Sequence, residues 1–152
     1  MIHDMKDKRG FTLLLSTLIA SLLLILGASM FNITRKEVIL SSLGRDSQFA
    51  FYAADAGAEC ALLWDFRYDI FGAAYEHSTS TCDSQALGTF QFPGYGVEQE
   101  FEYQPNGRCV RVSVTKVDDS PSTIILARGY NTSCAAIATN PRALERSIEL
   151  TY

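Results

Sequence analysis

Residues 11–31 have the sequence FTLLLSTLIASLLLILGASMF, which contains no charged side chain. A helix of this length, rising about 1.5 Å per residue, reaches across a hydrocarbon core of about 30 Å. Directly before it, residues 6–9 are KDKR and carry three basic side chains. Because basic residues favour the cytoplasmic side of a membrane, this order predicts a single span with the N-terminus in the cytoplasm. Arg35 and Lys36, beyond the run, act against that orientation.

Two other kinds of N-terminus share this order of basic and then apolar residues, namely a cleaved secretory signal peptide and a plain signal anchor. The apolar run exceeds the usual length of about 7 to 15 residues, and no A-x-A site closes it, so a signal peptide fits poorly. A signal anchor remains an alternative. It implies a single-pass exported protein whose head binds a ligand or a partner without polymerising.

The helical pattern continues beyond the apolar run. Residues 32–64 contain no proline, and small or apolar residues recur there at spacings of three and four. They are Ile39, Leu43, Ala50, Ala53, Gly57, Cys60 and Trp64. The small residues allow a helix to lie close to a sheet or to another helix. We therefore expect one helix over residues 11–64, with a transmembrane half at 11–31 and a soluble half at 32–64.

The remaining residues, 65–152, have the alternating pattern of strands and are expected to form a β-rich globular head. We expect residues 65–85 to form a loop with a short helix. Strands are expected at residues 87–92, 97–104, 109–117, 123–130 and 144–152. Short turns rich in Pro, Gly, Asn and Asp predict an antiparallel order. The expected fold class is α+β, in which a long N-terminal helix packs on a small antiparallel sheet.

The four cysteines, Cys60, Cys82, Cys109 and Cys134, are widely spaced, and no C-x-x-C pair occurs. Zinc is therefore not expected. An even number of cysteines in a small exported head indicates two disulfides, for which three pairings are possible. We favour Cys109 with Cys134, because their strands leave the same turn and can place them opposite each other, which leaves Cys60 with Cys82. Reduced, buried cysteines in a protein that stays in a reducing compartment are the alternative.

Several function classes have little support. The net charge is −4 and basic residues do not cluster beyond the N-terminus, which argues against a nucleic-acid partner. His3 lies near the N-terminus and His77 in a polar stretch, and no nucleophile elbow or phosphate-binding loop is present, so we expect no enzyme activity and no cofactor. Asp118 and Asp119 can offer oxygens to calcium, but two adjacent acids in a hairpin are more often a solvated turn, so no metal is expected.

Two segments carry a family resemblance. Residues 8–13, KRGFTL, resemble the class III signal of type IV prepilins and type II secretion pseudopilins, and residues 45–57, RDSQFAFYAADAG, are similar to a segment of PilX-type minor pilins. The resemblance implies that a prepilin peptidase cuts between Gly10 and Phe11, removes residues 1–10 and methylates Phe11. It also implies a pilin-like α+β fold, other pilin or pseudopilin subunits as partners, and passage from the inner membrane into an extracellular or periplasmic filament.

One residue departs from the pattern of that family. The fifth residue after the expected cut is Leu15, where most members carry a glutamate that pairs with the free amine of a neighbouring subunit. PilX-type and K-type minor subunits often lack this glutamate, so the departure favours a minor subunit. We expect such a subunit at or near the tip of the filament, unless Thr12 or Ser16 satisfies the amine. The expected function is thus structural, in a type IV pilus or a type II secretion pseudopilus.

Overall fold

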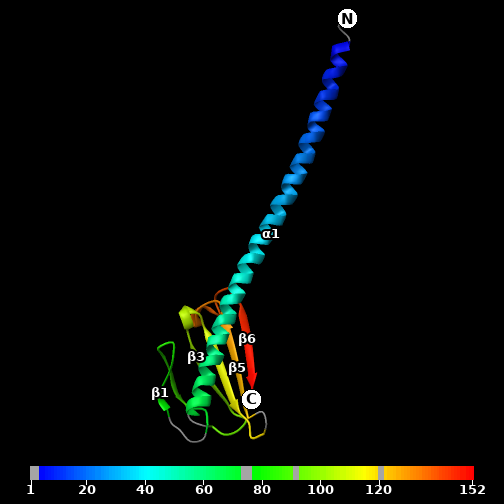
Figure 1. Cartoon of the computed structure of the whole chain (residues 1–152). Coiled ribbons are helices and arrows are strands. Elements are labelled where there is room, and N and C mark those ends of the chain that lie inside the picture. Colours follow the sequence, from blue (N-terminus) through cyan, green and yellow to red (C-terminus); the bar gives the residue numbers. More distant parts are fainter. Residues whose placement is uncertain (1–3, 73–76, 91–92, 120–121) are drawn as a thin grey trace. The chain divides into compact units, whose positions relative to one another are not determined.

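The structure is a computed structural model that describes residues 4–72, 77–90, 93–119 and 122–152, with side chains described from residue 11 except at 73–79 and in the two later gaps. In chain order its elements are α1 (Asp4–Tyr68), β1 (His77–Cys82), β2 (Gln85–Phe90), β3 (Glu98–Tyr103), the short 3-10 turn η1 (Pro105–Gly107), β4 (Val110–Lys116), β5 (Thr123–Tyr130), a second turn η2 (Cys134–Ala136) and β6 (Glu145–Thr151) (Figure 1). The chain divides into two compact units, Met1–Leu43 and Gly44–Tyr152. We call the second the globular unit.

Helix α1 includes the whole of the helix expected from the sequence and extends past it at both ends, from Asp4 to Tyr68. Its C-terminal end is set by Asp69, whose φ of 48° lies in the left-handed region. Aspartate tolerates this conformation better than most residues, because its short side chain bonds locally. The chain then turns back so that Ile70 and Phe71 are fully buried.

Four strands form a sheet in the order β3-β4-β5-β6. It is antiparallel, as the short turns predicted, whereas the strand order could not be predicted from the sequence. One row of the register shows how its inner face is built: Phe101 lies opposite Val112, Val112 opposite Ala127, and Ala127 opposite Ile148. The alternate residues of β3, Glu98, Glu100 and Glu102, are exposed on the other face. The sheet therefore has one apolar face, which packs on the second half of α1 (Figure 1). The α+β fold class is confirmed.

The helix lies unusually close to the sheet at β5. Ala50 and Ala54 are fully buried, and a Cβ added to Gly129 would collide with the backbone of α1 at these two residues. One turn along, Gly57 of the helix faces the side chains of Val110 and Val112 with no room for a Cβ. The small residues that the sequence placed along the helix thus serve helix-to-sheet contact within the globular unit.

The expectation of a loop with a short helix over residues 65–85 is wrong. Strands β1 and β2 form a separate two-stranded antiparallel sheet. They are joined by Asp83 and Ser84, whose φ angles of 48° and 62° are those of the turns that fit the twist of a hairpin. The sequence of β1, HSTSTC, has no alternation of apolar and polar residues, so its period could not be recognised. Strand β2 ends at Phe90, and the last two residues of the expected strand 87–92 lie outside the described part.

Three phenylalanine rings join this hairpin to the rest of the core. Phe71 follows the helix, Phe90 ends β2 and Phe101 lies in β3, and their ring centroids are 5.0 to 6.1 Å apart. The side chain of Gln99 donates a hydrogen bond to the carbonyl oxygen of Phe71 at 3.0 Å. Edge-to-face and stacked pairs at such distances add to the free energy gained by burial alone. The hairpin is thereby fixed to the four-stranded sheet.

The contact at Gly129 makes a testable prediction. Replacing Gly129 by alanine should lower the free energy of unfolding by about 2 kcal/mol, because the backbone of α1 cannot yield to the added methyl group. The measurement is denaturant unfolding of the full chain in detergent, followed by the fluorescence of Trp64, the single tryptophan. Gly44→Ala is the matched control, since nothing lies within 4 Å of its Cβ position. Equal stability of the two variants would contradict the close approach.

Candidate functional site

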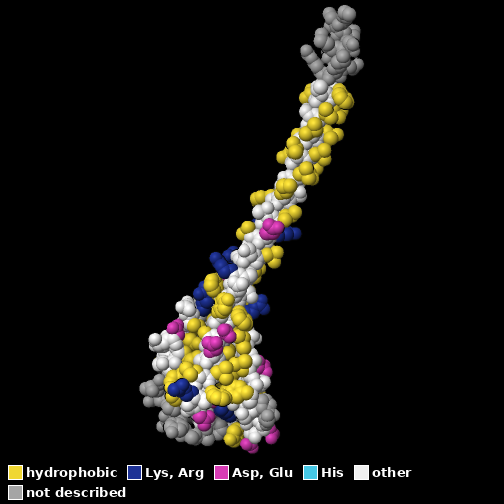
Figure 2. All heavy atoms as spheres, in the orientation of Figure 1, with side chains coloured by type: hydrophobic (Ala, Val, Ile, Leu, Met, Phe, Trp, Pro, Cys, Tyr) yellow, Lys and Arg dark blue, Asp and Glu magenta, His cyan; other side chains and the backbone are white. Residues whose placement is uncertain are grey.

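The unit Met1–Leu43 has its large apolar side chains exposed throughout its described part. All side chains from residue 11 to 45 are exposed, including Phe11 at 70% and Leu24 at 74%. A window of α1 has a mean hydropathy of 2.4 and no buried residue. Figure 2 shows these hydrophobic side chains along the helix. Apolar surface of this extent is unfavourable in water, so the segment is a candidate for a single membrane span.

The polar side chains within this segment are compatible with a hydrocarbon environment. Each of four hydroxyls donates a hydrogen bond of 2.8 to 2.9 Å to a carbonyl oxygen three residues earlier in the helix: Ser16, Thr17, Ser21 and Ser29. The backbone bonds of the helix are likewise internal. No hydroxyl in this set depends on water, which is the condition that a lipid core imposes on polar groups.

The expected peptidase site lies at the start of this segment. Gly10 is in the helical backbone of α1, but side chains of residues 1–10 lie outside the described part, as does the backbone of the first three residues. Phe11, the expected new N-terminus, is exposed, and so is Leu15, at 47%. Cleavage after Gly10 and methylation of Phe11 stay predictions.

Two disulfides are present in the globular unit, and their pairing agrees with the one favoured from the sequence. Cys60 of α1 is joined to Cys82 of β1, with a Cα–Cα distance of 6.1 Å. Cys109 is joined to Cys134, with a Cα–Cα distance of 4.7 Å. The bridges close loops of 22 and 25 residues in sequence separation. On the loop-entropy account each contributes roughly 3 kcal/mol to stability.

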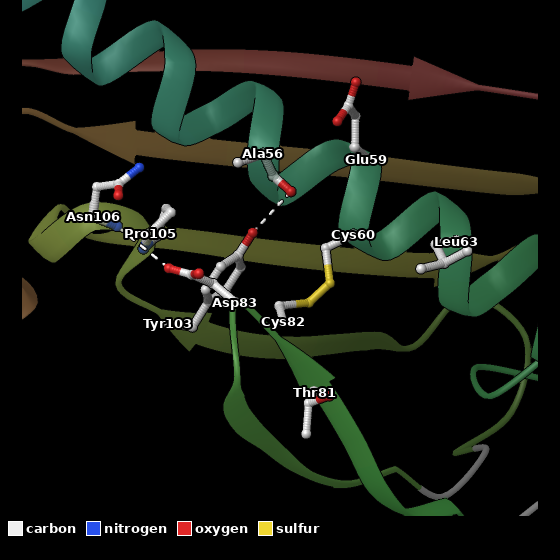
Figure 3. Close-up of a pocket in the computed structure, with 10 residues that line it drawn as sticks. All are labelled: Ala56, Glu59, Cys60, Leu63, Thr81, Cys82, Asp83, Tyr103, Pro105 and Asn106. Atoms are coloured by element: carbon white, nitrogen blue, oxygen red, sulfur yellow. Dashed lines mark hydrogen bonds between the residues drawn. A yellow bond between two sulfur atoms is a disulfide. The ribbon is translucent and has the colours of Figure 1, made fainter.

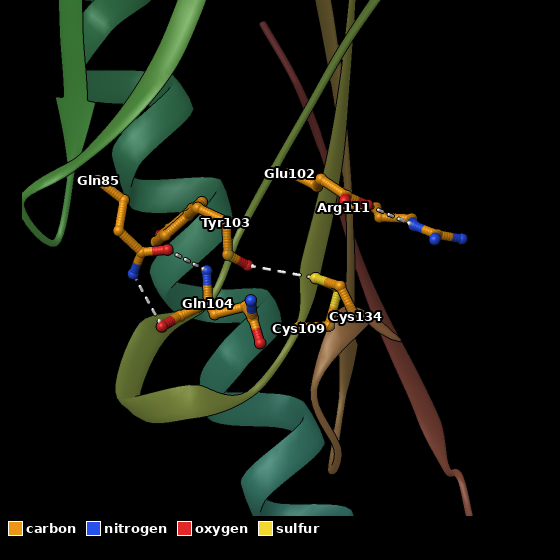
Figure 4. Close-up of a disulfide and its surroundings, with 7 residues drawn as sticks. All are labelled: Gln85, Glu102, Tyr103, Gln104, Cys109, Arg111 and Cys134. Atoms are coloured by element: carbon orange, nitrogen blue, oxygen red, sulfur yellow. Dashed lines mark hydrogen bonds and ion pairs between the residues drawn. A yellow bond between two sulfur atoms is a disulfide. The ribbon is translucent and has the colours of Figure 1, made fainter. Parts of the chain in front are cut away.

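The reason given for the second pairing needs correction. Cys109 does not lie opposite Cys134 in the strand register, because it shares backbone hydrogen bonds with Tyr130 and Thr132 instead. Cys134 begins the turn η2 after β5 has ended, and its sulfur lies 3.9 Å from the carbonyl oxygen of Tyr103 (Figure 4). The disulfide therefore fixes a loop onto the end of the sheet rather than joining two paired strands.

A buried ion pair, which the sequence reasoning missed, holds the end of α1 to the sheet. Asp65 is 5% exposed, and Lys116 of β4 approaches its two carboxylate oxygens at 2.6 and 2.8 Å. The hydroxyl of Tyr152 donates to Asp65 at 2.7 Å, and that of Thr123 contacts the same oxygen at 3.4 Å. Burial and the bond to this carboxylate raise the pKa of Tyr152 above its ordinary value. Such a charge is tolerated in the core only because it is paired and hydrogen-bonded.

The signal for this ion pair was present in the helical spacing. Ala58, Ala61 and Asp65 are separated by three and then four residues, which places Asp65 on the buried face of α1. The expected helix ended at residue 64, so Asp65 was not predicted to lie on its buried face. An acidic residue on a buried helical face predicts a basic partner, although the identity of Lys116 depends on the tertiary fold.

The other sequence candidates do not form a site in the described residues. Asp118 and Asp119 are exposed at the turn after β4. His77 begins β1 rather than a loop, and its side chain lies outside the described part, as does His3. The group of Glu102 with Cys109 and Cys134 has the spacing of a metal site, but both sulfurs are bonded in the disulfide and cannot act as thiolate ligands.

Comparison with known proteins gave no match. No family model matches the chain, and no curated protein or solved structure is significantly similar to it. The description of the site therefore rests on the sequence and structure of this chain.

Removing the basic partner of the buried carboxylate should be costly. We expect Lys116→Met to lower the free energy of unfolding by about 3 kcal/mol, because the buried carboxyl group of Asp65 would lose its basic partner. Arg111→Met is the matched control. It breaks the ion pair of Arg111 with Glu102, whose two side chains are 50% and 53% exposed, respectively, and should lower the free energy of unfolding by less than about 1 kcal/mol. Denaturant titration of the full chain in detergent compares them, and similar losses would rule out a dominant buried pair.

Proposed function

We propose that this chain is a minor structural subunit of a type IV pilus or of a type II secretion pseudopilus. It is made as a precursor with the leader 1–10, held in the inner membrane by residues 11–31, and assembled after cleavage at Gly10. Its partners are the prepilin peptidase and other pilin or pseudopilin subunits. The proposal assigns it no catalytic role.

One observation carries the proposal. The motif KRGFTL at residues 8–13 is followed directly by an apolar helical segment whose side chains are all exposed, and the same helix α1 continues into an α+β globular unit. An exposed apolar helix of this kind is stable in a lipid bilayer and also in a bundle of like helices. Both environments are needed by a subunit that leaves a membrane for a filament. Disulfides in the globular unit support an oxidising compartment on the far side.

The place of the subunit within the filament follows from Leu15. In the family, a glutamate at this position neutralises the amine of the subunit ahead. A subunit with leucine leaves that amine buried without a partner, which costs a few kcal/mol in an apolar environment. A subunit at the tip has no predecessor and avoids this cost. We therefore place the protein at or near the tip, in few copies.

Cleavage is tested at Gly10. Gly10→Glu should leave the leader attached and keep the protein in the inner membrane, so that filaments purified from the cells contain none of it. Met5→Glu is the control, since it adds the same charge to the leader away from the expected cut. Mass spectrometry of the unaltered mature protein should find a methylated N-terminus at Phe11. A mature chain that keeps Met1 to Gly10 would instead identify a plain signal anchor.

The tip position is tested by counting copies. Immunogold labelling of purified filaments should find the protein at filament ends, whereas Leu15→Glu should enter the shaft and raise the copy number per filament about tenfold or more. Leu18→Glu is the matched control, because it adds the same charge to an equally exposed position of the helix without meeting the amine. Regular labelling of the unaltered protein along the whole shaft would contradict the tip position.

A further inference from the structure

A hollow in two parts follows one side of α1 in the globular unit. The first part has a volume of about 400 Å³ and the second about 560 Å³. Ala56, Pro105 and Asn106 line both parts, so the two adjoin. Figure 3 shows the second part between the helix, the β1–β2 turn and η1. We call the two parts together the α1 groove. Its size is that of pockets that hold several side chains or a small ligand.

The first end of the α1 groove presents an arginine without a counterion. The guanidinium of Arg108 lies over the ring of Phe49, 3.8 Å from its centroid. Its Nε is buried and has no hydrogen-bond partner, and within the described ranges no carboxylate forms an ion pair with it. The described residues thus leave the positive charge of Arg108, which lines the first part of the groove, without an anionic partner, and a carboxylate in the groove would supply one.

Arg108 is also held in place before any ligand binds. Its backbone N–H donates to the carbonyl oxygen of Pro105 at 3.0 Å, and the next residue, Cys109, is fixed by a disulfide. A guanidinium presents its N–H groups in a planar fork that matches the two oxygens of a carboxylate. Tyr52 and Phe49 add aromatic surface beside it, suited to an apolar side chain.

The second end of the α1 groove has the opposite charge. Glu59 of α1 and Asp83 of the β1–β2 turn line it, and the Asp83 carboxylate accepts a long 3.4 Å hydrogen bond from the backbone of Asn106 (Figure 3). Burial, and to a smaller extent the negative charges of Asp83 and Glu59, raise the pKa of the Tyr103 hydroxyl to about 12. This end therefore suits a basic group.

We propose that the α1 groove binds an extended segment of a partner polypeptide that carries a carboxylate at the Arg108 end and a basic side chain at the end lined by Glu59. From Phe49 to Glu59 the helix rises about 15 Å at about 1.5 Å per residue. An extended chain covers that distance in about four to five residues. The two charges of the bound segment are thus about four residues apart, with apolar residues between them. The inference goes beyond the proposed function, since an anchored protein that never polymerises would hold the same groove.

The probe is the peptide acetyl-Asp-Leu-Ala-Ala-Lys-amide, titrated into the full chain in phosphatidylcholine nanodiscs and followed by calorimetry. We expect saturable binding with a Kd below about 1 mM. Arg108→Gln should weaken binding about tenfold or more, and so should asparagine in place of the aspartate of the peptide. The two changes together should cost little more than either alone, because they remove the same ion pair. Glu59→Gln should weaken binding as much as glutamine in place of the lysine of the peptide does, and the two changes together should cost little more than either alone.

Arg142→Gln is the matched control, since Arg142 is exposed and lies outside the α1 groove; it should leave the Kd unchanged. Should Arg108→Gln fail to fold, as judged by Trp64 fluorescence, the asparagine peptide on the unaltered protein decides the question. Binding that ignores the aspartate, or no saturation below about 1 mM, overturns the proposal. Succinate that binds as tightly as the peptide overturns the assignment to a polypeptide.

Discussion

The close contact between α1 and β5 is the constraint on which the globular unit depends. Ala50 and Ala54 meet the backbone at Gly129, so the helix and the sheet are held nearer than larger side chains allow. This proximity determines what else fits between the two layers. The branched side chains of β4 fill the space beside Gly57, and the Phe71 cluster closes the end where the helix stops. At the same end, Lys116 forms an ion pair with the carboxylate of Asp65, which the packing of helix on sheet buries.

Helix α1 contains two kinds of sequence: its first part is a candidate membrane span, and its second part packs in the globular unit. From residue 11 to 31 its side chains are large, apolar and exposed, and its hydroxyls bond within the helix. Between residues 50 and 61 the buried side chains are alanines, which allow dense packing rather than broad apolar contact. A single helix thus combines a candidate membrane span with a segment that packs in a protein core. The proposed path from membrane to filament requires this combination.

The parts of the fold that could be predicted from the sequence are those with a strong local period. The uninterrupted helix and the strands β3 to β6 have such a period, and the turns predicted that the strands are antiparallel, but the order of the strands in the sheet could not be predicted. The hairpin of β1 and β2 was missed because HSTSTC lacks alternation and its pairing is determined by a turn at Asp83. The partners of Asp65 and the position of Arg108 over Phe49 could not be predicted either. Both depend on residues distant in sequence that only the folded chain brings together.

The two disulfides also determine how the globular unit responds to tension. A pulling force along the chain passes directly through the bond from Cys60 to Cys82, and again through the bond from Cys109 to Cys134. The two enclosed segments, with sequence separations of 22 and 25 between their cysteines, are then bypassed. At about 3.5 Å per residue, roughly 75 Å and 85 Å of chain length cannot be drawn out. Strands β4 and β5 lie wholly within the second loop, so the centre of the sheet cannot be extended even when its edges are peeled away.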